Sequence, residues 1–270
     1  MSESAIGRIE INGAPAQIAD LRVLAATNYG HFTSMQVRDG CVRGLDLHLD
    51  RLQQATRTLF GTELDLAQVR AWMRQGIAPD PRRLSLRVNV FARGFDREHP
   101  AAPVQPDVLV AVGAPAQPRP APLRVKSFAF ERTLPEVKHV GTFPLFQHRR
   151  MAQLAGFDDA LFVDRNGHVS EGSVWNVLFV DGDEIVWPDS PQLRGVAMQL
   201  LQAGVERHGM RGSVQPVALA DVTRFRYACF TNSSQPVCAI SCIDAVEFTV
   251  DKDLGARLVA CYESNPLVRI

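Results

Sequence analysis

Lysine is scarce in this sequence, so an amine nucleophile has few candidates. Of the 29 basic residues, only Lys126, Lys138 and Lys252 are lysines. Lys138 lies in a largely uncharged segment, residues 135–142 (PEVKHVGT). A lysine with few compensating charges nearby has a lowered pKa, and its neutral amine can form a Schiff base with a carbonyl group. An exposed, solvated loop lysine is the competing interpretation, and this segment alone favours it.

A single carboxylate stands among small residues in the segment 169–176 (VSEGSVWN). Placed between two predicted strands, Glu171 can face a pocket. A carboxylate beside a pyridine nitrogen keeps that nitrogen protonated, which makes the ring an electron sink. Taken alone, the segment is better explained as a turn that carries a solvated glutamate.

Three further elements can bind an anion such as phosphate. Arg51 lies in an HLDRL segment. Gly195 and Ala197 belong to the start of a predicted helix, whose free N–H groups and dipole attract negative charge. Ser233 and Ser234 provide hydroxyls in a polar loop between two apolar segments. Each element alone is weak evidence, because Arg51 can be an ordinary surface arginine and the loop an ordinary turn.

An amine, a carboxylate and several anion donors together match the needs of one cofactor. Pyridoxal 5'-phosphate requires an amine for its aldehyde, an acid for its ring nitrogen and donors for its phosphate. Motifs of competing chemistries are absent from the sequence: G-x-G-x-x-G after a strand, a P-loop, G-x-S-x-G and H-E-x-x-H. The seven histidines are scattered, so the sequence predicts no metal site.

The order and context of these residues resemble the fold-type IV pyridoxal-phosphate enzymes, the class IV aminotransferase family. Residues 169–177 are similar to the family signature V-[TS]-E-G, two small or variable residues, x-N-[IV]. Residues 155–161 (AGFDDAL), between Lys138 and that signature, resemble the family's A-G-x-D-E-A-L. The resemblance covers most of the chain, from about residue 20 to about residue 250. The family includes branched-chain aminotransferases, D-amino-acid aminotransferases and 4-amino-4-deoxychorismate lyases.

The resemblance implies a role for each candidate residue. Lys138 would bind the cofactor covalently and move the substrate proton, Glu171 would pair with the pyridine nitrogen, and Arg51 would bind the phosphate. The remaining phosphate donors would be backbone groups and hydroxyls at Val196, Ala197, Ser233 and Ser234.

The substrate-binding candidates are Phe32, Arg93, Arg97 and His99. The last three resemble the stretch that binds the substrate carboxylate in D-amino-acid aminotransferases, where a bidentate guanidinium suits that group. Phe32 lies in an HFTS segment that resembles the F-T-T of aminodeoxychorismate lyases. The K-H pair at Lys138 and the TNS segment before Ser234 also resemble the lyases, so the resemblance leaves the branch of the family open.

Two departures from the family pattern concern binding. The helix after Gly195 begins V-A-M where the family usually has [IV]-T-R, so a phosphate-binding hydroxyl is missing and weaker cofactor binding is expected. Residues 28–32 (NYGHF) are shorter than the family's Y-G-D-G-x-F, a loop that borders the substrate.

The resemblance further implies an α+β fold with two domains: a small N-terminal α/β-sandwich-like domain and a larger C-terminal barrel-like domain, as in D-amino-acid aminotransferase. It also implies a homodimer with the cofactor between the domains. Four prolines in residues 113–122 (GAPAQPRPAP) independently predict an extended linker, because proline disfavours helix and removes backbone donors. The predicted boundaries are 1–114 for the N-terminal domain, 115–122 for the linker and 123–270 for the C-terminal domain.

Local patterns predict the elements that position these residues. Asp39-Gly40 predicts a tight hairpin turn, because this pair tolerates the positive φ angles of such turns. Apolar residues at helical spacing predict helices over residues 45–59 and 195–208. Runs typical of strands occupy residues 84–93, 107–114, 160–164, 177–180, 184–187, 227–230 and 237–240.

Composition limits the class of protein. The chain has 270 residues, of which 46% are hydrophobic and 21% charged, with a formal net charge of zero; these values are typical of a soluble globular protein. The charge balance argues against a dedicated nucleic-acid binder, and no apolar run is long enough to span a bilayer. Five cysteines without a C-x-x-C pair, and the lack of a signal-peptide pattern, predict a cytoplasmic protein without a disulfide framework.

We therefore predict a pyridoxal-phosphate-dependent transaminase that transfers an amino group between an amino acid or amine and a 2-keto acid. The alternative with the same cofactor is an aminodeoxychorismate lyase, which would release pyruvate and 4-aminobenzoate. An alternative of another class is a cofactor-free, catalytically silent binding protein, and retention of both Lys138 and Glu171 argues against it. The expected partners are small-molecule substrates and a second copy of the chain.

Overall fold

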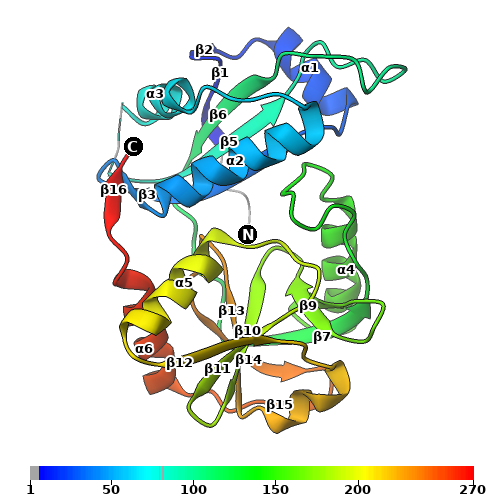
Figure 1. Ribbon diagram of the computed structural model, residues 1–270, viewed down its shortest axis with the longest axis vertical. Helices are drawn as coiled ribbons and strands as arrows, with labels where there is room; N and C mark the ends of the chain where they lie inside the picture. Colours follow the sequence, from blue (N-terminus) through cyan, green and yellow to red (C-terminus); the bar gives the residue numbers. More distant parts are fainter. Residues whose placement is uncertain (1–5, 79, 81) are drawn as a thin grey trace. The chain divides into compact units, whose positions relative to one another are not determined.

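Residues 6–78, 80 and 82–270 are described by the structure, a computed structural model, and they belong to two units (Figure 1). The N-terminal unit comprises residues up to Gln117 together with Val137–Gly141 and Leu267–Ile270. The barrel unit comprises Pro118–Glu136 and Thr142–Pro266. The sequence-based boundaries placed both late segments of the N-terminal unit in the C-terminal domain. The structure groups them otherwise because each forms β-type backbone bonds with the N-terminal sheet.

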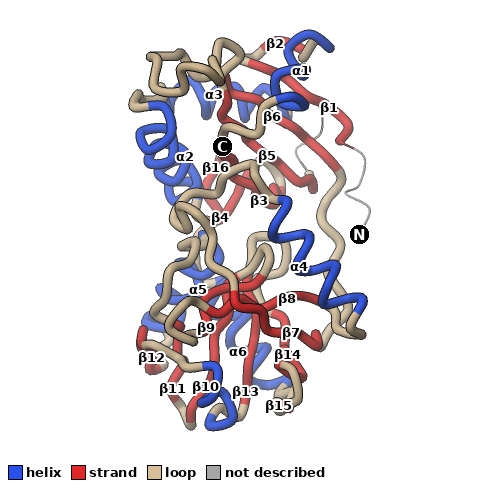
Figure 2. Tube along the Cα trace, turned by 90° about the vertical axis from the view of Figure 1, so that its right-hand side faces the viewer, coloured by secondary structure: helices blue, strands red, loops and turns tan. Residues whose placement is uncertain are grey.

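The N-terminal unit is built on a seven-stranded sheet in the order β16-β4-β3-β5-β6-β1-β2, in which every pairing is antiparallel. Figure 2 shows β16 beside β4. The strands are β1 (Ile6–Ile11), β2 (Ala14–Pro15), β3 (His31–Arg38), β4 (Cys41–Arg43), β5 (Arg83–Phe91), β6 (Asp107–Gly113) and β16 (Leu267–Arg269). The helices are α1 (Ile18–Ala26), α2 (Leu45–Phe60) and α3 (Leu66–Ile77).

The predicted hairpin and helix in this unit are confirmed. Asp39 and Gly40 both have positive φ, 51° and 72°, which lets β3 turn directly into β4. Leu45, Leu49 and Leu52 lie on the buried face of α2 and pack on apolar side chains of the sheet. The helix therefore runs along β3 with its apolar stripe inward, and this arrangement fixes the direction of its polar residues.

The barrel unit contains a nine-stranded sheet that closes on itself. Strands β7, β8, β9, β10, β13 and β14 pair in that order, and β14 pairs with β7 to complete the ring (Figure 1). The predicted α+β fold with a barrel-like C-terminal part is confirmed. The strands are β7 (Leu123–Ala129), β8 (Asp159–Val163), β9 (Val169–Gly172), β10 (Asn176–Asp181), β11 (Glu184–Pro188), β12 (Arg211–Gln215), β13 (Tyr227–Thr231), β14 (Cys238–Ile243) and β15 (Val246–Glu247).

Apolar side chains fill the interior of this barrel, so polar chemistry must lie at the ends of its strands. Val125, Leu161, Val177, Phe179, Phe230 and Ile240 belong to this core and are all buried. Helices α5 (Val196–Arg207) and α6 (Lys252–Glu263) share a second apolar core with β10, β11 and β13. Gly204 allows their close approach, because a Cβ there would lie 1.9 Å from the carbonyl oxygen of Cys261.

Helix α4 (Phe143–Leu154) packs through Ala152 near β7 and β8. A short 3-10 helix, η1 (Leu219–Arg224), precedes β13. Within the described ranges, no helix combines the length and apolar character needed to cross a membrane.

Candidate cofactor site

Lys138 belongs to a short segment, Val137–Gly141, that lies along the beginning of β3. The N–H of Phe32 donates to the carbonyl oxygen of Lys138 at 2.9 Å, and the N–H of Val140 donates to that of Gly30 at 2.9 Å. Two backbone bonds therefore hold the lysine in β-type pairing with the N-terminal sheet. Such pairing fixes the backbone and directs the side chain away from the strand-to-strand hydrogen bonds.

The amine of Lys138 lies over an aromatic ring. Its Nζ is 4.9 Å from the centroid of Phe32. On the same ring the guanidinium carbon of Arg87 lies 3.7 Å from the centroid. Phe32 is buried, so these cation–π contacts help to restrict the amine. The structure thus brings together two of the predicted residues, Lys138 and Phe32.

Arg51 reaches β3 from helix α2 through a directed chain of hydrogen bonds. His48 and Arg51 are three residues apart and share one helix face. Arg51 Nη2 donates a short hydrogen bond to Thr33 Oγ1, and Thr33 Oγ1 lies 2.6 Å from His48 Nδ1. Because a guanidinium can only donate, the hydroxyl accepts from Arg51 and donates its own proton to His48. This direction requires an imidazole with an unprotonated Nδ1.

The surroundings keep both histidines of this cluster neutral. Burial lowers the pKa of His48 well below its usual range, and the charges of Arg51 and Lys138 lower it further. Burial, followed by the charge of Arg51, lowers the pKa of His31 to about 3. His31 Nε2 lies 2.9 Å from the hydroxyl of Thr56. The positive charge near His48 therefore comes from the guanidinium and the lysine, not from imidazole.

Arg51 is a partly buried cation without an acidic partner among residues 6–78, 80 and 82–270. None of the ion pairs there includes it. Its Nε is buried and makes no hydrogen bond within that part of the chain. Burial lowers the pKa of Arg51 to about 10, so the group stays charged at neutral pH. A buried donor without a hydrogen-bond partner costs free energy, and an anion on Nε would offset that cost.

On the barrel unit, polar residues of three neighbouring strands form a row. Asn176 of β10 lies opposite Glu171 of β9 and opposite Thr231 of β13. Residues directly opposite each other on neighbouring strands point to the same face. The Asn176 amide also donates to the carbonyl oxygen of Leu193 at 2.7 Å and to Gln192 Oε1 at 2.9 Å. The row is thereby joined to the loop that leads into α5.

The beginning of helix α5 lies against this row. Its N-cap is Gly195, which provides no side-chain cap, and a Cβ there would lie 2.2 Å from Asn176 Oδ1. Val196 and Ala197 follow and are buried. The first N–H groups of a helix have no intrahelical acceptor and attract anions. The predicted phosphate-binding backbone is therefore fixed next to the row by a contact that only glycine permits.

A buried hydroxyl on the row has no hydrogen-bond partner in the described ranges. It belongs to Thr231, which is fully buried. Thr231 belongs to the TNS segment but was not among the predicted site residues. Ser233 is partly buried, whereas Ser234 is exposed and its N–H donates to Asn232 Oδ1 at 3.0 Å. Their predicted roles as phosphate donors stay predictions.

The Glu171 carboxylate is buried and held at both oxygens. Oε1 accepts from Arg132 Nε at 2.8 Å, and Oε2 accepts from the N–H of Leu193 at 3.3 Å. The side chains of Arg132 and Glu171 are 6% and 8% exposed. Arg132 was not predicted from the sequence, because it is 39 positions from Glu171 and meets it only in the folded barrel. No local pattern could have shown this pairing.

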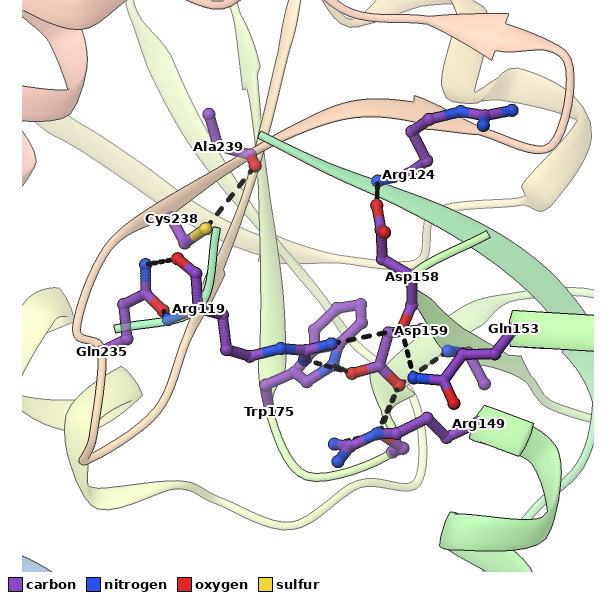
Figure 3. A network of polar contacts seen from close by, with 12 residues as sticks. Arg119, Arg124, Arg149, Gln153, Asp158, Asp159, Trp175, Gln235, Cys238 and Ala239 are labelled. Carbon is purple, nitrogen blue, oxygen red and sulfur yellow. Dashed lines mark hydrogen bonds and ion pairs between the residues drawn. The ribbon is translucent and has the colours of Figure 1, made fainter. Parts of the chain in front are cut away.

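A second buried carboxylate fixes the turn between β9 and β10 (Figure 3). Asp159 Oδ1 accepts from Ser173 Oγ at 2.5 Å, and Asp159 Oδ2 accepts from Trp175 Nε1 at 2.9 Å. Arg149 and Arg119 form ion pairs with the same carboxylate. Burial alone would raise the pKa of Asp159, but the two guanidinium groups and the hydrogen bonds hold it below its usual value. This network anchors the turn that follows the Glu171 strand.

The residues predicted to bind the substrate carboxylate lie after β5 and are engaged or exposed. Arg93 donates to Asp20 at 2.7 Å and to Asp107 at 2.8 Å, and these hydrogen bonds raise its pKa. His99 Nδ1 lies 2.8 Å from Asp96 Oδ2, and both side chains are exposed. Arg97 is also exposed. Their substrate role stays a prediction, and Arg93 would have to exchange an internal carboxylate for that of the substrate.

The chain matches a family model described as amino-transferase class IV over residues 30–243. This match covers more than half of the sequence. The chain belongs to the class IV amino-transferase family, which confirms the predicted family. No curated protein sequence matches it.

Several solved structures share the fold of this class IV amino-transferase. A fold IV transaminase, CpuTA1, from Curtobacterium pusillum is 23% identical with a TM-score of 0.79, and the match covers 94% of this chain and 92% of that chain. A putative 4-amino-4-deoxychorismate lyase from Legionella pneumophila is 20% identical (TM-score 0.80; 94% and 96% covered). The PLP-bound form of a hypothetical aminotransferase from Mycobacterium tuberculosis is 19% identical (TM-score 0.77; 95% and 99% covered).

The buried histidines predict a loss of stability in weak acid. The unfolded chain takes up protons near the ordinary histidine pKa of 6.5, whereas folded His31 and His48 do so only at far lower pH. The free energy of unfolding should therefore decrease as the pH is lowered from 7 to 5. The limiting slope is about 1.4 kcal/mol per pH unit for each histidine. Urea unfolding at several pH values measures this slope.

A His31→Gln variant should lose about half of that slope. The matched control is His208→Gln, since His208 is exposed, and this variant should keep the full slope. An equal slope in both variants would show that the buried histidines are not responsible.

Proposed function

We propose that this chain is a pyridoxal-phosphate-dependent transaminase that transfers an amino group between an amino acid or amine and a 2-keto acid. The observation that carries the proposal is the guanidinium of Arg51, whose buried Nε has no hydrogen-bond partner within the described residues. The charges of both Arg51 and Lys138 lower the pKa of His48, so both groups lie near this histidine. An anion on the guanidinium would therefore lie in the same region as the amine. In a class IV amino-transferase, a molecule with a phosphate and an amine-reactive aldehyde fits both groups.

When bound, pyridoxal 5'-phosphate supplies an aldehyde that links to amines and a ring that withdraws electrons from the attached α-carbon. The chain's own donors would hold its phosphate: the guanidinium of Arg51, the backbone N–H groups of Val196 and Ala197, and the hydroxyls of Ser233 and Ser234. The buried hydroxyl of Thr231 is a further candidate donor. It would compensate for the absence of the hydroxyl that the family usually has at the Ala197 position.

Two side chains would carry the proton chemistry. Lys138 Nζ would bind the cofactor. Once displaced by the substrate amine, the neutral Nζ would take the proton from the substrate α-carbon and return it to the cofactor carbon. The backbone hydrogen bonds between the Lys138 segment and β3 hold the lysine backbone in place while its side chain moves. The Glu171 carboxylate would hold a proton at the ring nitrogen, and its contacts with Arg132 and Leu193 keep it buried and aligned for that task.

The lyase alternative shares every residue named above and differs in outcome. It is supported by the K-H pair at Lys138, by the TNS segment that ends at Ser233, and by the likeness of fold to a protein named as a putative 4-amino-4-deoxychorismate lyase. The transaminase is preferred because the matching family model is described as amino-transferase class IV. The five free thiols support a reducing, cytoplasmic location.

Incubation of the purified protein with pyridoxal phosphate should give the visible absorption band of a lysine-bound cofactor. Borohydride should fix the cofactor on Lys138, as located by peptide mass spectrometry, because reduction makes the link permanent. Lys138→Ala should show neither the band nor the adduct. The exposed Lys252 provides the control, since Lys252→Ala should behave as wild type. Absence of the band at every cofactor concentration would contradict both enzyme proposals and favour the silent binding protein.

The same preparation separates transaminase from lyase. A transaminase should lose the visible band when a suitable amino acid is added alone and regain it when a 2-keto acid follows. A lyase should instead release pyruvate from aminodeoxychorismate without any amino acceptor. Pyruvate release without an acceptor, together with no change of the band by amino acids, would contradict the transaminase.

We also propose that the chain forms a homodimer. Helix α4 supports this proposal because it leaves four large apolar side chains exposed: Phe143, Phe146, Met151 and Leu154. Exposed apolar groups gathered on one element are typical of surfaces that another chain covers. Sedimentation equilibrium should give twice the chain mass of 29.8 kDa, and a strict monomer would contradict the proposal.

A further inference from the structure

Arg132 contacts two parts of the chain that the proposed chemistry depends on. Its Nε donates to Glu171 Oε1 at 2.8 Å, and its Nη2 donates a short hydrogen bond to the carbonyl oxygen of Pro135. Pro135 stands three residues before Lys138 in the sequence. One guanidinium therefore holds the carboxylate assigned to the ring nitrogen and also the turn that leads to the lysine.

The turn that Arg132 closes has a conformation that needs support. Leu134 has a positive φ of 49° and directly precedes a proline. A bulky residue with positive φ is strained by on the order of 1–3 kcal/mol, and such a conformation persists only where its surroundings enforce it. The bond from Arg132 to the next carbonyl group is a direct means of enforcing it. Because both contacts come from one planar group, the position of Glu171 is coupled to the shape of this turn.

The ion pair also sets the charge on Glu171. Both side chains are nearly fully buried, and a buried carboxylate without a cation tends to take up a proton. A protonated Glu171 could no longer favour a proton on the ring nitrogen. Arg132 thus differs from the guanidinium groups at Asp159, which hold a turn but do not contact Glu171 in the bonds described above.

We propose that Arg132 is a positioning residue that keeps Glu171 ionised and aligned toward the cofactor ring nitrogen, while it fixes the turn before Lys138. This inference rests on the proposed cofactor and on the role of Glu171. It assigns to Arg132 control over how strongly the ring is protonated, which a purely structural ion pair would not have.

The pH midpoint of the visible band tests this role without an activity assay. A proton on the ring nitrogen repels a proton on the nitrogen that links lysine to cofactor, so loss of the ring proton raises the midpoint. Arg132→Met should raise it by about one pH unit or more, and Glu171→Gln should do the same. The double variant should match Glu171→Gln alone, because Arg132 acts through Glu171.

Two further variants guard against general damage. Arg132→Lys restores a positive charge beside Glu171 and should return the midpoint toward the wild-type value even if Arg132→Met folds poorly. Arg207→Met removes a guanidinium that bonds to Asn265 and Ser264 at the far end of α5. It should lower the thermal unfolding temperature but leave the midpoint unchanged.

The inference and the proposed function fail in different ways. If the wild type gives no lysine-bound band, the proposed function fails. If the wild type gives the band but Arg132→Met keeps the wild-type midpoint, the inference alone is overturned. Shifts that add in the double variant, or an equal shift in Arg207→Met, would likewise overturn it and leave the cofactor assignment intact.

Discussion

Arg51 lies partly buried in the N-terminal unit with its Nε fully buried, and the described part of the chain gives it no acidic partner. Its surroundings are arranged to tolerate that charge and do not neutralise it. Thr33 accepts one of its N–H groups, and His48 and His31 stay neutral because burial lowers their pKa values. Desolvation of the Arg51 Nε without a hydrogen-bond partner costs stability, so an anion such as a phosphate that binds there would stabilise the unit.

The barrel unit fixes a second set of polar groups. Apolar side chains fill its interior, and the polar row of Glu171, Asn176 and Thr231 lies at the ends of strands β9, β10 and β13. The start of α5 is fixed against this row at Gly195. Buried ion pairs hold the carboxylate and the following turn. Such fixed donors and charges need little rearrangement when a ligand binds, which is the basis of electrostatic preorganisation.

Local chemistry explains which elements and residues the sequence could predict. The Asp39-Gly40 turn depends on the φ preferences of two adjacent residues, and helix α2 on a repeat within one segment. Lys138 and Arg51 could be named as candidates because lysine is rare and the surrounding segments resemble a family. Their roles still depend on contacts that form only in the fold.

Long-range pairing explains what the sequence could not show. The addition of β16 to the edge of the N-terminal sheet joins residues more than 200 positions apart, and the pair of Arg132 with Glu171 needs a closed barrel. Arg93 illustrates the opposite case. Its local pattern suggested a substrate-binding arginine, but strand pairing brings Asp107 to it, and helix α1 brings Asp20. A motif identifies the type of a side chain, and the fold decides which partner it meets.

The most direct test of this account compares the affinities of pyridoxal phosphate and of pyridoxal, which lacks the phosphate. If the Arg51 guanidinium is the phosphate site, Arg51→Gln should reduce the preference for the phosphorylated form by about 10-fold to 100-fold, as expected for charge-assisted hydrogen bonds. Affinity for pyridoxal itself should change little. The control Arg57→Gln alters an exposed arginine of the same helix, paired with Glu63, and should keep the wild-type preference. An unchanged preference in Arg51→Gln would contradict the central claim.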